Sequence, residues 1–169
     1  MGQVVAAGRR ESMPFNTPFE TGLRALALLV AGYPSGFDLQ RLVIFDHLCV
    51  HAGDIGGPDS LHAPVPMRSA ELLVRRQLVE RGLLLMIGKG LIQRSAENAG
   101  IMYRAGDFAE TFLASLSSSY VTALRNRSQW VVNSFAAMTD AEIRQRTGTF
   151  LERWEEQFQV AHRSLSEGL

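Results

Sequence analysis

Residues 78–106 read LVERGLLLMIGKGLIQRSAENAGIMYRAG, and this stretch decides the fold that the sequence predicts. Its first part is apolar at helical spacing and stops at two glycines, Gly88 and Gly90. The pattern then becomes short, because residues 91–94 and 101–104 are two brief strand-like runs. A turn over residues 95–100, which contains Asn98 and Gly100, separates them. This stretch therefore predicts a helix followed by a β-hairpin.

Three helices are expected before the hairpin. One begins near Glu20 and stops at residues 32–34, and a second begins at Asp38 as N-cap and ends at Gly53. Residues 54–67 are rich in Gly and Pro and predict a long irregular loop, after which Ser69 caps a helical region over 70–89. Residues 1–18 are expected to form a flexible N-terminal arm, with Met13 as an alternative start to Met1.

Helical pattern resumes after the hairpin. A helix is expected from Asp107, with Phe108, Phe112 and Leu113 on its apolar face, and another over residues 120–137. Thr139 and Glu142 have capping-box spacing for a last helix that reaches about residue 165. The prediction is a mainly α (α+β) fold, with residues 19–165 as a single domain. It has a winged helix-turn-helix-like core, a small β-hairpin and an added C-terminal helical segment.

Composition excludes several classes of protein. The 169 residues are 46% hydrophobic and 20% charged, which predicts a folded chain with a real core. Seventeen basic and seventeen acidic residues balance, so bulk charge does not favour nucleic acid or an anionic membrane. Cys49 is the only cysteine, which leaves no internal disulfide, and no apolar run reaches membrane-spanning length. We expect a soluble, cytoplasmic protein.

A local basic surplus nevertheless lies at the third helix and the hairpin. Residues 68–94 carry six basic residues against Glu71 and Glu80. The candidate contacts to DNA or to a protein partner are Arg75, Arg76, Arg81, Lys89, Arg94 and, on the wing, Arg104. In the position of a recognition helix, however, the chain reads LLLMIGKG where a DNA reader would present polar side chains. A protein-facing surface is favoured, and DNA contact stays open.

One cluster could carry chemistry. His47 and His51 have i, i+4 spacing, and Asp54 and His62 follow them, which is a combination that zinc sites use. The Glu of an HExxH motif is absent, since position 48 is Leu. The four residues are therefore interpreted as a structural or functional loop, with a small metalloenzyme as the alternative. We assign no catalytic residue, no metal and no cofactor, because the sequence also lacks GxSxG and phosphate-loop motifs.

Aromatic residues recur towards the C-terminus, at spacings compatible with one helical face. They are Trp130, Phe135, Phe150, Trp154 and Phe158. Such a stripe is typical of a packed core, and otherwise of a partner surface.

Several segments together resemble a known family. They are NTPFETGLRALALL (16–29), FDLQRLVIFDHLCVHAGDIGGPDSLHAPVP (37–66), SAELLVRRQLVERGLLLM (69–86) and GKGLI (88–92). Over residues 16–158 the chain is similar to the middle component 2 family of bacterial ABC three-component systems. The resemblance implies a non-enzymatic adaptor that links an SMC- or Rad50-like ABC ATPase to an effector such as a nuclease, in a Lamassu-like antiphage defence complex. It supplies no catalytic residues. The alternatives from the residues alone remain a winged-helix DNA-binding regulator and the small His-ligated metalloenzyme.

Overall fold

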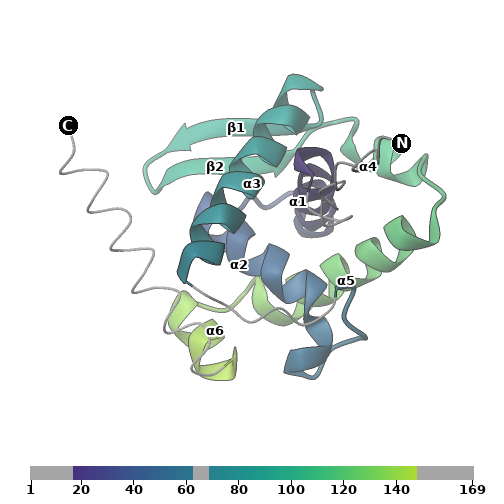
Figure 1. Cartoon of the computed structure of the whole chain (residues 1–169). Coiled ribbons are helices and arrows are strands. Elements are labelled where there is room, and N and C mark those ends of the chain that lie inside the picture. The colour runs from purple at the N-terminus through teal and green to yellow at the C-terminus, as the bar shows by residue number, and fades with distance from the viewer. Residues whose placement is uncertain (1–16, 63–68, 148–169) are drawn as a thin grey trace, which may run out of the picture.

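The computed structural model describes residues 17–62 and 69–147 (Figure 1). This part of the chain is mainly helical with one small antiparallel sheet, in agreement with the predicted α+β class. The elements in chain order are α1 (Pro18–Gly32), α2 (Leu39–Val50), η1 (Ala52–Ile55), α3 (Ser69–Gly88), β1 (Ile92–Glu97), β2 (Gly100–Ala105), α4 (Ala109–Ala114), α5 (Ser119–Phe135) and α6 (Asp140–Thr147).

Helix α1 is the centre of the domain, with α3 and α5 on either side of it (Figure 1). Every residue from Thr21 to Leu29 is buried, which is expected of a helix that is apolar on all sides. The helix begins earlier than predicted. Thr17 and Glu20 form a capping box, so residues 17 and 18 belong to the helix rather than to the predicted arm. The remainder of the arm, with Met13, lies outside the described residues.

Helix α3 is a single helix, although Gly82 lies within it. Gly82 packs against α1, where a Cβ atom would approach the Gly22 nitrogen to 2.5 Å. A Cβ on Gly22 would likewise approach the Gly82 carbonyl oxygen to 2.7 Å. The two glycines let the helix backbones touch, so Gly82 serves close packing rather than helix termination.

The hairpin is confirmed, with longer strands than the sequence indicates. Pairing runs from Ile92–Ala105 to Glu97–Gly100, so the connecting turn is shorter than predicted. Gly100 follows the turn with a φ of 116°, which glycine adopts without strain. Residue Phe37, between α1 and α2, pairs with Tyr103 through two backbone hydrogen bonds of 3.0 and 2.9 Å. The α1–α2 connection is thereby attached to the outer side of β2.

The helices after the hairpin begin close to the predicted positions, with one correction at the start of α4. Phe108 precedes α4 and is 72% exposed, so its assignment to a buried helix face was wrong. Ser118 caps α5, and the Thr139–Glu142 capping box that opens α6 is confirmed by both of its hydrogen bonds. The predicted continuation to residue 165 lies outside the described residues. Among the helices of the described part, none combines the length and apolar character needed to cross a membrane.

Candidate functional site

Three charged side chains meet where α1, α2 and α3 come together. Arg24 of α1 donates from Nε to Asp46 Oδ1 of α2 at 2.6 Å and from Nη2 to Oδ2 at 3.4 Å. Arg75 of α3 donates from Nη1 to Asp46 Oδ2 at 2.6 Å. The Arg24 and Asp46 side chains are 1% and 3% exposed, and that of Arg75 is 19% exposed. One carboxylate thus joins all three helices.

The pKa values of the three groups follow from this arrangement. Burial raises the pKa of the Asp46 carboxyl, but the charges of Arg24 and Arg75 outweigh burial and hold it at about 2. Burial opposes the charge of Arg24, and attraction to Asp46 nevertheless raises the Arg24 pKa above its ordinary value. Asp46 therefore stays a carboxylate at neutral pH, and two cations share one anion.

Uncharged histidines surround this network. The rings of His47 and His51 lie 4.7 Å apart on α2 and at its end, and burial and the charge of Arg75 lower the pKa of both. Burial, with a contribution from Arg24, lowers the His62 pKa to about 4. His62 Nε2 lies 3.3 Å from the hydroxyl oxygen of Tyr120. The histidines are neutral at pH 7, which fits a site that already holds an excess cation.

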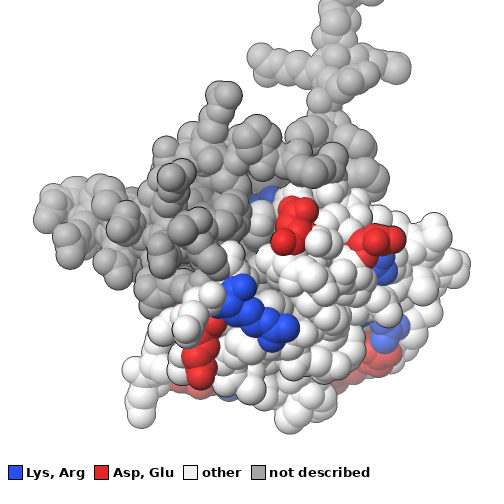
Figure 2. Space-filling view, turned by 90° about the horizontal axis from the view of Figure 1, so that it is seen from below, with Lys and Arg blue, Asp and Glu red and all other residues white. Residues whose placement is uncertain are grey.

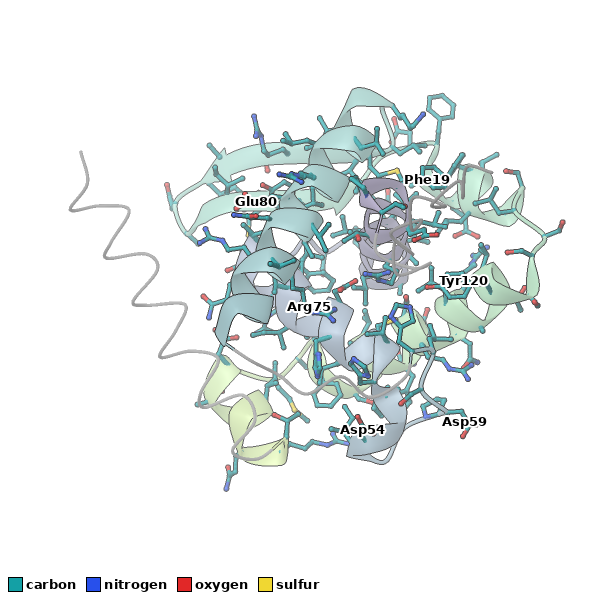
Figure 3. All side chains as sticks on the ribbon, viewed as in Figure 1. Phe19, Asp54, Asp59, Arg75, Glu80 and Tyr120 are labelled. Atoms are coloured by element: carbon teal, nitrogen blue, oxygen red, sulfur yellow. The ribbon has the colours of Figure 1, made fainter. Side chains whose placement is uncertain are left out.

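The predicted set of metal ligands does not assemble into a metal site. Asp54 lies exposed on η1, and His62 lies beside Tyr120 of α5 (Figure 3). Over residues 17–62 and 69–147, no group of three His, Cys, Asp or Glu side chains is arranged to hold a metal ion. Hydrogen bonds support the other interpretation, in which these residues belong to a structural or functional loop. Ser60 accepts a hydrogen bond from the Gly53 amide, and the amides of Leu61 and His62 both donate to the Val50 carbonyl.

Helix α5 holds the other side of this loop. Gly57 lies against the Trp130 ring so closely that a Cβ would approach it to 2.5 Å, and Arg127 Nε donates to the Asp59 carbonyl at 3.0 Å. Trp130 in turn meets buried Phe135 edge to face at 5.7 Å. The described part of the predicted aromatic stripe is therefore core. Its other members, Phe150, Trp154 and Phe158, lie outside the described residues.

The predicted basic contacts divide into two sets. Three have acidic partners, because Arg75 binds Asp46, Arg76 binds Glu80 and Arg104 binds Glu97. The other three, Arg81, Lys89 and Arg94, are exposed and have no acidic partner in the described ranges. On the face seen in Figure 2, blue and red side chains lie beside one another among many uncharged ones. Of the predicted contacts, those without an acidic partner thus lie on the second half of α3, just after its end and on β1.

The apolar run of α3 is divided between core and surface. Val79, Leu83 and Met86 are buried against the domain, whereas Leu84 is 58% and Leu85 36% exposed. Their neighbours on the exposed side, one to three turns earlier, are Arg81, Gln77 and Val74. We refer to the set Val74, Gln77, Arg81, Leu84 and Leu85 as the α3 outer face.

Sequence reasoning missed Arg24 and Asp46. The available signal was a charged residue inside an otherwise apolar helix, as in LRALALLV (23–30) and VIFDHLCV (43–50). A charge on such a helix must be buried, and a buried charge needs a partner. The pattern could have paired the two residues, but not Arg75, which lies on an ordinary polar stretch.

Comparison with known proteins gives one match. The family model described as ABC-three component (ABC-3C) system Middle Component 2 matches residues 14–157. No curated protein and no solved structure matches the chain.

Proposed function

Because the chain belongs to the ABC-three component system Middle Component 2 family, we propose that it is the non-enzymatic adaptor of such a system. In this proposal it joins an SMC- or Rad50-like ABC ATPase to an effector such as a nuclease, in a cytoplasmic antiphage complex of the Lamassu type. The family description names a middle component of a multi-component system, which implies partner proteins. In the proposed assembly, this chain contributes a surface that binds a partner protein.

The α3 outer face is the observation that carries the proposal. Leu84 and Leu85 are exposed on the second half of a long helix, and Arg81 lies between them and Val74. Apolar side chains on a helix face, with an arginine whose stem can pack and whose head can pair, are typical of protein–protein contacts. Such a face suits a protein partner better than a DNA groove.

The buried charge network supports the non-enzymatic part of the proposal. A general base near neutral pH needs a pKa close to 7, whereas the pKa of Asp46 is about 2. Burial raises the pKa of the Cys49 thiol to about 12, so it is a poor nucleophile. These groups are suited to hold helices together rather than to transfer protons.

Co-purification tests the adaptor proposal. The tagged chain is expressed with its neighbouring genes, and the wild type is expected to recover the ATPase and the effector in a fixed ratio. Leu84→Glu with Leu85→Glu is expected to remove one of them, while Ile101→Glu, at another exposed apolar residue, leaves recovery unchanged. A wild-type protein that purifies alone would contradict an adaptor. Unchanged recovery with the double variant would exclude the α3 outer face.

A winged-helix DNA-binding protein is the second candidate. Three helices precede the hairpin, as in a winged helix, and the Phe37–Tyr103 pairing adds an isolated β-bridge from the connection between the first two helices. The cations Arg81, Lys89 and Arg94 lie where such a domain would meet phosphates. This candidate predicts DNA binding by the isolated protein that weakens steeply with salt and on replacement of these cations by Gln. Fluorescence anisotropy with labelled duplex DNA measures it.

A further inference from the structure

The α3 outer face is one continuous row of exposed side chains on a helix that crosses the surface of the domain in front of the hairpin (Figure 1). Neighbouring members of the row are three or four residues apart, so they follow one another along the same side of α3. Residues 74–88 of this side span about 21 Å, which is four helical turns. Side chains in such a row interdigitate readily with those of a second helix that packs alongside.

Gly88 belongs to the same side of α3, because it follows Leu84 and Leu85 by four and three residues. It is exposed, and a Cβ on it would meet none of the described residues within 4 Å. Its φ is not positive, in contrast to that of Gly90. Neither the packing of the described chain nor the backbone conformation therefore requires a glycine here, although glycine is unfavourable in a helix. The bare backbone allows a second helix to approach closely, as Gly82 allows α1 to approach on the inner side of α3.

Positive charge without a partner borders this face. Arg81 is on the face itself, Lys89 follows the end of α3, and Arg94 is on β1, which packs against α3. None of the three has an acidic partner in the parts of the chain that the structure describes. The acidic neighbour of Arg81 in the sequence, Glu80, pairs instead with Arg76. An occupant that supplies negative charge is therefore favoured, and a second copy of the same face is not, because it would add further cations.

We propose that the α3 outer face binds an acidic amphipathic helix of a partner protein. The apolar stripe of that helix packs on Leu84 and Leu85, its backbone passes close to Gly88, and its Asp or Glu side chains pair with Arg81 and Lys89. DNA fits this face less well, because phosphates offer no contact to its leucines. The inference rests on the proposed adaptor function, since it states the chemistry of the partner that the adaptor binds.

Site-specific photo-crosslinking in the co-expressed complex tests the inference. In the tagged full-length chain, p-benzoylphenylalanine replaces Gln77, an exposed and uncharged residue of the face. The chain is expressed with its neighbouring genes, and the cross-linked peptide is identified by mass spectrometry. The expected peptide belongs to one partner protein and has apolar residues at helical spacing, flanked by Asp and Glu. The same substitution at Gln129, exposed on α5, is the control and is not expected to reach this peptide.

Two variants test the individual contacts. Arg81→Glu with Lys89→Glu is expected to lose most of the cross-link, and changing two acidic residues of the cross-linked peptide to Lys is expected to restore it. Gly88→Leu is expected to lose the cross-link while the isolated chain keeps its thermal stability. The matched control reverses two cations of α5 and α6, Arg125→Glu with Arg146→Glu, and leaves the cross-link unchanged. Far-UV circular dichroism confirms that each variant is folded, and Arg81→Gln with Lys89→Gln replaces a charge reversal that is not.

The outcomes separate this inference from the proposed function. A wild-type chain that recovers no partner contradicts the adaptor function and the inference together. When partners are recovered, the adaptor function stands, and the inference alone is overturned by any of three results at position 77: no cross-link, a cross-link to a peptide without acidic residues, or one that survives the charge reversal. A product that nuclease digestion removes would assign the face to DNA, and a product between two copies of this chain would assign it to a homodimer. Both of these also overturn the inference.

Discussion

The substitution Asp46→Asn should destabilise this protein strongly. Asp46 is the single anion between Arg24 and Arg75, and the Arg24 side chain is 1% exposed, so water cannot take over its charge. Asn keeps the shape of the side chain and removes the charge. Two cations are then left together, one of them buried and uncompensated.

The magnitude follows from the structure in two ways. Removing one partner of a buried ion pair typically costs about 3–5 kcal/mol, which is a large part of a total stability of about 5–15 kcal/mol. The lowered pKa of Asp46 gives a second value for this free energy. Because Arg24 and Arg75 lower the Asp46 pKa from 3.8 to about 2, ionisation of this carboxyl stabilises the fold by about 2 kcal/mol. We expect a loss of about 3 kcal/mol at pH 7.

Urea unfolding at pH 7, followed by circular dichroism, measures this loss, and Asp54→Asn is the matched control because Asp54 is exposed. The direction in which this stabilisation changes with pH follows from the lowered pKa of Asp46. A lowered pKa stabilises the fold above the ordinary value of 3.8, and this stability is lost as the pH falls towards 2. Wild type and Asp46→Asn should therefore converge in strong acid. A loss below about 1 kcal/mol at pH 7, as for an exposed pair, would refute the reasoning.

Three further predictions concern single positions. His62→Gln should flatten the fall in stability between pH 6.5 and 4, because the buried ring has a pKa of about 4 and the unfolded chain takes up a proton in this window; urea midpoints across this range measure it, and an unchanged slope contradicts it. Gly82→Ala should cost about 1–3 kcal/mol by forcing α1 and α3 apart, whereas Gly88→Ala on the same helix meets nothing within 4 Å and should be neutral or slightly stabilising in thermal unfolding. Cys49 should react with a thiol reagent only as fast as the protein unfolds, because it is buried and its pKa is raised to about 12; rapid modification in native buffer argues against this packing.

Local signals in the sequence determine much of the fold. Asp38 and the Thr139–Glu142 pair cap helices at the positions where their side chains predict a start. The change from helical to short spacing after Gly90 locates the hairpin. These features could be predicted because each depends on residues within a few positions of one another.

Tertiary packing determines what the sequence left open. Phe108 has helical spacing with Phe112, but α4 begins one residue later and leaves the Phe108 ring in water. Gly82 reads as a weak point in a helix, and its role appears only when Gly22 of α1 is placed against it. Intrinsic helix propensity predicts neither the exposure of Phe108 nor the packing of Gly82, because both depend on the tertiary structure.

The network of Arg24, Asp46 and Arg75 also depends on residues that are distant in the chain. It explains why the basic surplus in residues 68–94 overstates the positive charge available on the surface. Arg75 counts as a surface cation in the sequence, yet it pairs with an aspartate 29 residues earlier. Since Asp46 is shared, Arg24 and Arg75 fix α1 and α3 to α2 at a single point. Helix α3 is therefore held by its inner side, while Arg81, Leu84 and Leu85 remain on its outer side. The buried network thus holds α3 in place with this outer side exposed, which is consistent with the proposed adaptor role.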